Sequence, residues 1–511
     1  MKEKKMKTQN QFTPQNLDYI LSLDSDRWLF HADVLVDKAH VVMLEERDII
    51  SRKQSRDILN GLIAIEQRGA AEFIEHELLA QAQAQAHAYA YDDVHTAIES
   101  VLIRELGEGT GGRMHTGRSR NDEVATCIRI ALRDDLIELM KGVNELRSAV
   151  IAKAAEHVDT VMPGYTHLQH AQPTTLAHHL SAYSDAFARD FARLVTVYER
   201  TNVSPLGAAA FASTGFPLDR ASTAKLLGFD SVMPNSMDAV STRDFAIEAI
   251  ACFANLMTNL SRLAEEIILW STAEFDFVRV PEDYITGSSI MPQKRNPDFT
   301  ELVRSRTGTV YGCLMSALAI CKALPCAYNR DLQEVTTHLL NATKTTAASV
   351  SVMNHIVAGL EPKEEEMEKQ TLVGFTTATE LADTIVRATG ISFRTAHRIV
   401  SSLAPALTQK EIHELEPGGD ILRRIDALAV DVTGKKLSEL GLTEENVKEA
   451  MDVRSNIEKR NVYGGPAKEQ VRKAIETRTR DLNGDENLVE AKEEGVKRSL
   501  EELERRIAEL R

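Results

Sequence analysis

Residues 245–270, FAIEAIACFANLMTNLSRLAEEIILW, decide the fold class of this chain. Apolar side chains recur in this stretch at alternating steps of three and four residues, at Ile250, Phe253, Met257, Leu260, Ala264 and Ile267. That period places an apolar stripe along one long helix, and such a stripe is stable only when it packs on other helices. Residues 126–155 and 173–200 fit two further long helices, and the period-two alternation of strands is nearly absent. The sequence therefore predicts an all-α fold built on a helical bundle.

The domain organisation follows from where this periodicity begins and ends. A chain of 511 residues exceeds one compact core. The glycine-rich GEGTGGRMHTGRSRND separates short helical patterns from the long ones, and shorter helices follow the bundle. We expect an N-terminal helical domain (1–116), a central bundle (117–370) and a small C-terminal domain (371–511) that ends in an amphipathic surface helix from about residue 488. Some bundle helices are apolar around more of their circumference than one partner covers, which indicates an oligomer.

Composition excludes several functions. The formal net charge of -16 argues against binding to nucleic acid or to an anionic membrane surface. The five cysteines form no CxxC pair, which is typical of free thiols in a reducing compartment. The basic N-terminus lacks an apolar signal segment, and no apolar run is long enough to span a bilayer. We expect a cytoplasmic protein whose ligand is a small molecule.

Three polar motifs each allow two interpretations from the residues alone. GEGTGG has the glycine spacing of a dinucleotide loop, but a helical pattern rather than a strand precedes it, so we interpret it as a turn. In HTGRSRND, Arg118 and Arg120 at a helix start would clamp a carboxylate, or Asn121 or Asp122 would cap the helix while the arginines stay solvated. NRDLQEVTTH fits a polar network at a helix start nearly as well as a ligand contact.

Two further motifs contain residue combinations that are typical of ligand-binding and catalytic sites. PGYTHLQHAQPTT carries Thr166, His167 and Gln169 just before Pro173, which suits a ligand site at the entrance of the next helix; no nearby carboxylate or cysteine completes a zinc set with its histidines. YITGSSIMPQKRNPD (284–298) combines flexible Gly287–Ser289 with stiffening prolines and a lysine. A loop that bears a hydroxyl base beside a cation is typical of catalysis, and a solvated linker fits it poorly.

At GSSIMPQKRNP the chain resembles the signature loop of the fumarase/aspartase superfamily, whose members eliminate a group beta to a carboxylate and release fumarate. Within it, the chain is similar to the argininosuccinate lyase family in GGRMHTGRSRND, PGYTHLQHAQPTT, SPLGAAAFASTGFPLDR, NSMDAVSTRDF, GSSIMPQKRNPD and AYNRDLQE. The likeness runs from about residue 21 to 475. It implies a three-domain homotetramer with active sites built from three subunits, and cleavage of argininosuccinate to arginine and fumarate, the last step of arginine biosynthesis. It implies no metal and no organic cofactor.

The resemblance also implies a role for each matching residue. Ser288 would be the base that removes the proton from the succinyl carbon, and His167 would help protonate the departing guanidino nitrogen. The other matching residues would hold the substrate's carboxylates: Lys294 and Asn296 with Thr166 beside them, Arg120 and Asn121, and at the opposite end Tyr328 and Gln333.

The chain departs from the family pattern at two positions. Asp37 stands where the family has a serine, and Thr336 stands where it has a lysine that pairs with a substrate carboxylate. Arg330 or His338 is a candidate substitute for that lysine. Two alternatives stay open: a related ammonia- or purine-releasing lyase, which Gln293 and HTGRSRND disfavour, and a catalytically silent structural protein on the same scaffold.

Overall fold

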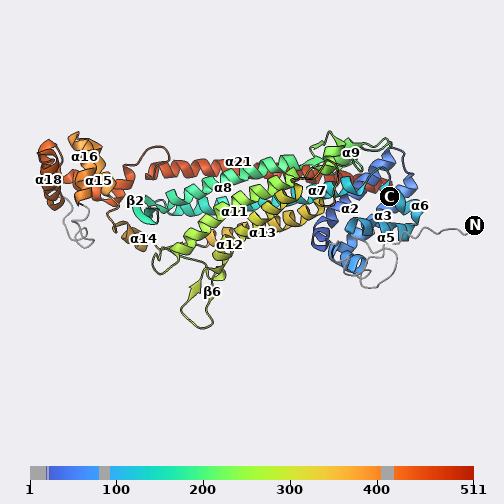
Figure 1. Cartoon of the computed structure of the whole chain (residues 1–511), viewed down its shortest axis with the longest axis horizontal. Coiled ribbons are helices and arrows are strands. Elements are labelled where there is room, and N and C mark those ends of the chain that lie inside the picture. Colours follow the sequence, from blue (N-terminus) through green and yellow to red (C-terminus); the bar gives the residue numbers. More distant parts are fainter. Residues whose placement is uncertain (1–18, 20–21, 80–92, 404–418) are drawn as a thin grey trace, which may run out of the picture.

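The computed structural model describes residues 19, 22–79, 93–403 and 419–511. In this part of the chain the molecule is a long rod, with N-terminal helices at one end, a small helical domain at the other and a bundle of long helices between them (Figure 1). The prediction of an all-α fold is confirmed. The described strands are short hairpins and bridges, and none joins a sheet of more than two strands.

Five long helices form the bundle: α7 (Arg120–Glu156), α8 (Leu176–Thr201), α11 (Asp244–Trp270), α12 (Asp298–Cys321) and α13 (Leu332–Ala358). Helix α11 matches the predicted stretch to within one residue. Helix α7 begins six residues earlier than predicted, because the Ser119 hydroxyl caps its first turn and the Asp122 carboxylate accepts the Ser119 backbone N–H at 3.0 Å. Capping chemistry thus extends the helix into HTGRSRND.

The prediction that Pro173 opens the next helix is wrong. Pro173 lies in strand β2 (Gln169–Thr175), opposite Pro163 of strand β1 (Val161–Thr166) in an antiparallel hairpin. Helix α8 begins three residues later, at Leu176, where the Thr175 hydroxyl accepts the His178 backbone N–H. A proline is tolerated in a two-stranded ribbon because one edge of each strand is free.

The N-terminal elements pack around the first turns of α7 and so determine where the polar residues of that end meet. They are α2 (Leu23–Glu46), α3 (Arg52–Phe73), η1 (Ile74–Leu79), α5 (Val94–Leu106), α6 (Glu108–Gly111) and η2 (Gly112–His115). On the same end lie α9 (Arg220–Leu226), α10 (Ser236–Ser241) and the parallel pair β3 (Val203–Ser204) and β4 (Ser231–Val232). Apolar side chains of α2, α3 and α5 join the core of the bundle without a break.

The small domain at the other end has a hydrophobic core of its own, which includes Leu381, Ile385, Ile399, Ile425 and Leu437. Its elements are α15 (Ala378–Thr389), α16 (Phe393–Leu403), α18 (Gly419–Thr433), η5 (Ser438–Leu440), α19 (Glu444–Met451) and α20 (Val453–Glu458). Helix α14 (Glu364–Thr371) connects it to the bundle, where β5 (Val278–Arg279) pairs with β8 (Glu361–Pro362).

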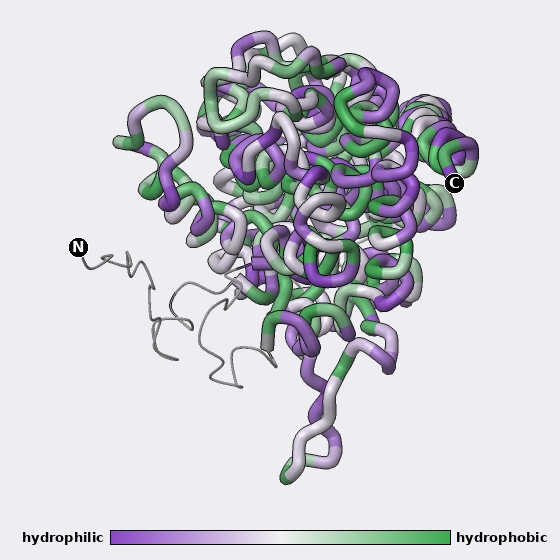
Figure 2. The backbone as a smooth tube through the Cα atoms, turned by 90° about the vertical axis from the view of Figure 1, so that its right-hand side faces the viewer, coloured by the Kyte–Doolittle hydropathy of each residue, from purple (hydrophilic) through white to green (hydrophobic). Residues whose placement is uncertain are grey.

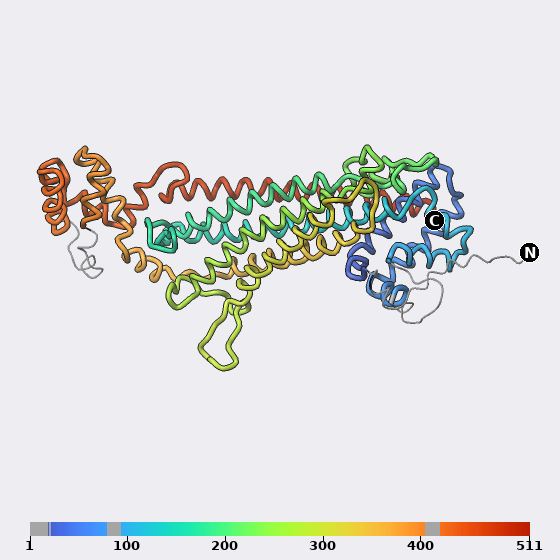
Figure 3. The backbone as a smooth tube through the Cα atoms, in the orientation of Figure 1, coloured from blue at the N-terminus to red at the C-terminus, as the bar shows by residue number. Residues whose placement is uncertain are grey.

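The C-terminal helix α21 (Lys468–Leu510) runs back along the bundle to the N-terminal end (Figures 1 and 3). It begins about twenty residues before the expected amphipathic helix. Its heptad-spaced Val489, Val496, Leu503, Leu510 and its Ile507 are buried in the same core as the bundle helices. The domain limits at 116 and 370 stay predictions, and we propose that α21 belongs with the bundle rather than with the small domain.

Between α11 and α12 the chain leaves the rod as a projecting hairpin. Strands β6 (Thr286–Gly287) and β7 (Arg295–Asn296) pair at its base, next to η3 (Glu282–Tyr284). Figure 2, which looks along the bundle, shows this segment standing away from the remaining chain with an apolar tip. Ile290 is 82% exposed there. An apolar side chain held so far from its own core is typical of a surface that another molecule covers.

Candidate active site

A pocket of about 270 Å³ lies at the N-terminal end of the bundle, between α2, α5, the first turn of α7 and the start of α13. It brings together four of the residues predicted from sequence: Arg120, Asn121, Tyr328 and Gln333. The first two and the last two of these residues lie about 200 positions apart in the sequence. The packing of α7 against α13 brings them together in the lining of one pocket. In HTGRSRND the helix is capped by Ser119 with Asp122, and Arg120 faces a cavity.

The polar side chains that line this pocket have hydrogen-bond and ion-pair partners. Arg120 forms an ion pair with Asp93 and a hydrogen bond with Thr96. The Asn121 side chain donates to the Ala210 carbonyl at 3.0 Å, which leaves its amide oxygen as an acceptor. Thr336, at the position of the family's lysine, is 5% exposed, lines the same pocket and brings no charge.

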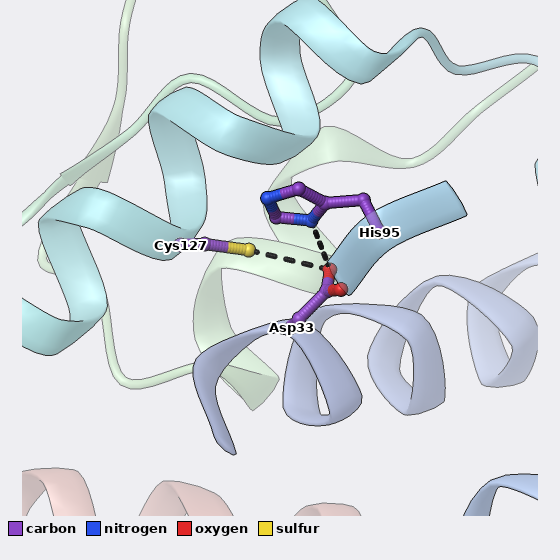
Figure 4. A group of neighbouring side chains, drawn as sticks. All are labelled: Asp33, His95 and Cys127. Atoms are coloured by element: carbon purple, nitrogen blue, oxygen red, sulfur yellow. Dashed lines mark hydrogen bonds and ion pairs between the residues drawn. The ribbon is translucent and has the colours of Figure 1, made fainter. Parts of the chain in front are cut away.

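The interpretation of Arg118 as a solvated residue is wrong. Its side chain is fully buried behind the pocket, where Nη2 contacts the Asp37 carboxylate and lies 3.1 Å from Oε1 of Glu123. Asp33 of α2 joins this group: its Oδ1 lies 2.9 Å from Nδ1 of His95 in α5 and 3.5 Å from Sγ of Cys127 in α7 (Figure 4). We call Asp33, Asp37, His95, Arg118 and Glu123 the buried charge cluster.

Burial and mutual repulsion set the protonation of the buried charge cluster. Burial raises the pKa of Asp37 to about 7 and that of Glu123 to about 8, although Arg118 opposes both shifts. Burial alone would lower the pKa of His95, but the Asp33 carboxylate outweighs it and raises that pKa to about 9. His95 is therefore an imidazolium at neutral pH, and it and Arg118 are the two cations that face the three carboxyl groups of the cluster.

Two sets of side chains in this cluster have the spacing of metal ligands, namely Asp33, His95 and Cys127, and Asp33, Asp37 and Glu123. Arg118 already contacts two of the carboxylates, and a protonated imidazole offers no lone pair to a metal at the nitrogen that carries the proton. The arrangement is that of an internal salt cluster. We assign no metal to it.

The β1–β2 hairpin carries Thr166 and His167 at the other end of the bundle. His167 and Leu168 occupy the turn with φ values of 57° and 56°, in the left-handed region that non-glycine residues rarely adopt. Thr166, His167 and Leu168 are exposed. The tight turn thus points polar side chains outward, and Thr166 lines a second pocket of about 360 Å³ beside Trp270 and Arg460.

Ser288 lies on the projecting hairpin, where its hydroxyl oxygen accepts the backbone N–H groups of Met291 at 3.0 Å and Ile290 at 3.3 Å. Lys294 is exposed and Asn296 is half-buried at the base of the hairpin. The turn folds the amides of Ile290 and Met291 back onto the Ser288 hydroxyl. Two donors aimed at one hydroxyl oxygen stabilise its deprotonated form.

One chain does not bring these three groups together. The pocket with Arg120, the hairpin with Thr166 and His167, and the segment with Ser288 lie at three separate places along the rod (Figure 1). The structure also reveals pocket residues that the sequence reading missed, namely Asp26, His95 and Arg243. Arg243 could have been proposed from the sequence, because it lies in NSMDAVSTRDF, one of the motifs that carry the family resemblance. Asp26 and His95 lie on ordinary amphipathic helices, where no local sequence motif marks them as site residues.

A family model described as "Lyase" matches residues 30–312, and the long-helix bundle with its hydroxyl-bearing loop and separate polar pocket is consistent with that class. Solved structures agree: EDDS lyase in complex with formate has a TM-score of 0.84 at 31% identity over 97% of this chain and 94% of its own. A fumarate lyase from Mesorhizobium sp. BNC1 shares the fold, with a TM-score of 0.68 at 19% identity over 90% of this chain and 97% of its own.

Within that class the sequence relationship is more specific. A model of the argininosuccinate lyase C-terminal region matches residues 375–458. The chain is 52% identical to the argininosuccinate lyase of Methanococcoides burtonii over 92% of this chain and 91% of that protein. It is 50% identical to that of Methanosarcina barkeri over 91% and 90% of the two chains. The chain belongs to the argininosuccinate lyase family and is a carbon–nitrogen lyase.

Proposed function

We propose that the chain cleaves argininosuccinate to L-arginine and fumarate, as the last step of arginine biosynthesis, with Ser288 as the base. The observation that carries the role of Ser288 is the pair of backbone N–H groups donated to its hydroxyl oxygen. Those donors favour the alkoxide that must accept the succinyl proton, and a neighbouring Lys294 adds positive charge.

The elimination then proceeds through a stabilised carbanion. Proton removal leaves an electron pair on the carbon next to a carboxylate, and this pair moves into that carboxylate as a doubly charged species. Lys294 and Asn296, with Thr166, supply fixed donors for it; loss of one such donor costs about 3 kcal/mol of transition-state stabilisation. The pair returns to form the fumarate double bond as the carbon–nitrogen bond breaks, and His167 supplies the proton that the guanidino nitrogen takes.

The substrate's remaining groups are held in the N-terminal pocket by Arg120, Asn121, Tyr328 and Gln333, which line one cavity. A guanidinium fork and side-chain amides match a carboxylate in geometry and charge. No metal or organic cofactor enters this reaction, because the chain's own donors supply the charge stabilisation that the step requires.

We propose that the active site forms in a homotetramer, because its three segments are separate within one chain. Helix α12 presents a face that is open in the described part of the chain. Tyr311, Met315 and Leu318 are 44–65% exposed there, and nothing outside the helix's own neighbouring turns lies within 4 Å of where a Cβ on Gly308 or Gly312 would be. Small and apolar residues on one helix face allow close packing against a second copy.

A charge on this face tests the assembly. Met315→Glu is expected to shift the chain from tetramer to smaller species in light scattering and to abolish cleavage. Leu488→Glu, on the exposed side of α21, is the matched control and should change neither property. A Met315→Glu monomer that retains activity would contradict an active site shared between subunits.

We also propose a cytoplasmic location, which the free cysteines support. Cys127, Cys252, Cys313, Cys321 and Cys326 are all unpaired, and disulfides are rare in reducing compartments. None of the described helices combines the length and apolar character that a membrane span requires.

The deciding experiment mixes the purified chain with argininosuccinate and follows fumarate by ultraviolet absorbance. Fumarate and L-arginine should form in equal amounts. Absence of fumarate would leave the catalytically silent scaffold as the answer. Fumarate from adenylosuccinate alone would indicate a related lyase instead.

A further inference from the structure

A loop beside the N-terminal pocket exposes two aromatic side chains. Phe211 and Phe216 are 45% and 49% exposed, although phenylalanine is among the residues most often buried. They lie in residues 205–219, which connect β3 to α9 and which we call the phenylalanine loop. Large apolar side chains that face outward from a folded segment are typical of a surface that another molecule covers.

The phenylalanine loop is held in one shape by hydrogen bonds. Oδ2 of Asp122, in the first turn of α7, accepts the backbone N–H groups of Gly207 and Ala209, each at 2.8 Å. The Ser213 hydroxyl donates to the Gly207 carbonyl at 3.0 Å, and the Ser213 backbone N–H donates to the Ala208 carbonyl at 2.8 Å. A preformed surface loses little conformational entropy when it binds a partner.

The same loop lies against the pocket that holds substrate groups in the proposed reaction. The Asn121 side chain lines this pocket and donates to the carbonyl of Ala210, the residue before Phe211. At the other end of the loop, Cδ2 of Leu218 lies 3.0 Å from the position that a Cβ on Gly117 would take, so the loop also packs on HTGRSRND. Phe211 is therefore one residue away from a direct contact with the pocket lining.

The projecting hairpin has an apolar tip that matches this surface. Ile290 is 82% exposed and Met291 is 41% exposed, and both donate backbone N–H groups to the Ser288 hydroxyl. In one chain the hairpin at β6 and the loop before α9 lie at separate places along the rod (Figures 1 and 3). A contact between the two surfaces therefore requires two copies of the chain.

We propose that the tip of the projecting hairpin, Ile290 with Met291, docks on Phe211 and Phe216 of a second copy of this chain. Both surfaces are apolar, and both are exposed in the single chain. Docking removes them from water, and this burial stabilises the arrangement in which the hairpin of one subunit lies beside the N-terminal pocket of another.

The spacing of the two segments around the substrate supports this pairing, which rests on the proposed function. That function requires Ser288 to reach a substrate held beside Asn121. Ile290 follows Ser288 by two residues, and Phe211 follows Ala210, which accepts the Asn121 side chain. When Ser288 faces the pocket, the two apolar side chains are brought together. The docked tip positions the base and does not itself touch the reacting atoms.

Cross-linking tests the contact directly. Ile290→Cys and Phe211→Cys are combined with Cys326→Ser, which removes the exposed native thiol, and a short bis-maleimide is added. Covalent dimers and larger species should appear on a denaturing gel. In the control, Phe393→Cys replaces Phe211→Cys, because Phe393 of α16 is 44% exposed and lies outside the phenylalanine loop. The control should give monomers. Monomers from the Ile290→Cys and Phe211→Cys chain would overturn the inference.

The other exposed hairpin tip provides a competing partner for the same surface. Leu168, in the turn between β1 and β2, is 68% exposed. If Leu168→Cys cross-links to Phe211→Cys and Ile290→Cys does not, the phenylalanine loop binds the β1–β2 hairpin, and docking of the projecting hairpin is wrong.

Kinetics test whether the contact positions the base. Ile290→Ser and Phe211→Ser should each lower kcat for argininosuccinate cleavage about tenfold, since each removes an apolar side chain from the docked state. The double variant should be no slower than either single variant, because both lose the same contact. Inhibition by L-arginine should stay unchanged, since the pocket lining is intact.

An additive loss of about a hundredfold in the double variant would mean that the two residues act independently, and it would overturn this inference while cleavage by the wild-type chain still stands. A wild-type chain that releases no fumarate would instead overturn the proposed function.

Discussion

Charged side chains are buried in the buried charge cluster and exposed on the projecting hairpin. In the cluster, Arg118 and His95 are buried beside Asp33, Asp37 and Glu123. On the hairpin, Lys294 is exposed and Ser288 has only backbone amides around its hydroxyl. The first region is complete within one chain, whereas we propose that the second becomes a site only when another subunit covers it. Changes in the two regions should therefore separate stability from activity.

Ser288→Ala should give the largest effect, and only on activity. Loss of the base is expected to lower kcat by about 10²- to 10⁴-fold, since a positioned base contributes about that much. The hairpin is not packed in the core, so the melting temperature should stay unchanged. Ser289→Ala, at the exposed neighbouring position, is the control. Turnover that survives in Ser288→Ala would remove this residue from the mechanism.

Arg118→Met should give the largest loss of stability. Removing the cation leaves Asp37 and Glu123 buried with one fewer partner, and breaking such a group costs about 3–5 kcal/mol. Urea denaturation measures the free energy of unfolding, and Arg394→Met on the exposed side of α16 is the control. An unchanged free energy of unfolding in Arg118→Met would show that the cluster is hydrated and weakly coupled.

The pH dependence of stability should follow the cluster as well. The pKa values of Asp37 and Glu123 are raised in the folded chain to about 7 and about 8. The folded state therefore binds these protons more tightly than the unfolded state, and this stabilisation is complete below about pH 4 and lost as pH rises through 7 to 8. His95, with its pKa raised to about 9, loses its contribution between pH 6.5 and 9.

The measurement is the urea midpoint between pH 5 and pH 9, which should fall as pH rises. Asp37→Asn removes one of the raised groups and should make the fall shallower, whereas Asp431→Asn at an exposed position should reproduce the wild-type curve. A midpoint that rises over this range in the wild-type chain would show that the cluster titrates differently.

Partly exposed ion pairs at the surface should give the smallest effect. Arg506 of α21 bonds to Glu46 of α2 and to Glu502 of its own helix, near solvent. Arg506→Ala should cost about 0.2–1 kcal/mol, as is usual for exposed pairs, and the loss should shrink in high salt. A loss as large as that of Arg118→Met would mean that α21 depends on this pair rather than on its buried apolar residues.

Ser288, Lys294 and Asn296 could be proposed from sequence because their signal is local: one short segment holds the hydroxyl, the cation and the turn residues. The start of α8 was misjudged because Pro173 fits the first turn of a helix as well as it fits a two-stranded ribbon, and only pairing with Pro163 decides between them. The burial of Arg118 was not predicted either. It depends on the Asp37 carboxylate of α2, and nothing in the sequence around Arg118 indicates that this partner lies nearby.

By itself, the sequence determined the helical class and the long helices, and it marked the loop as a candidate catalytic segment, because helical periodicity and turn composition act over a few residues. Only the tertiary structure decided that Arg120, Tyr328 and Gln333 share a pocket with Asp26 and Arg243, and that Arg118 balances a buried acidic cluster. The physical reason is that burial and charge pairing depend on which distant segments meet, and the free energy of a charge is set by those neighbours rather than by its place in the chain.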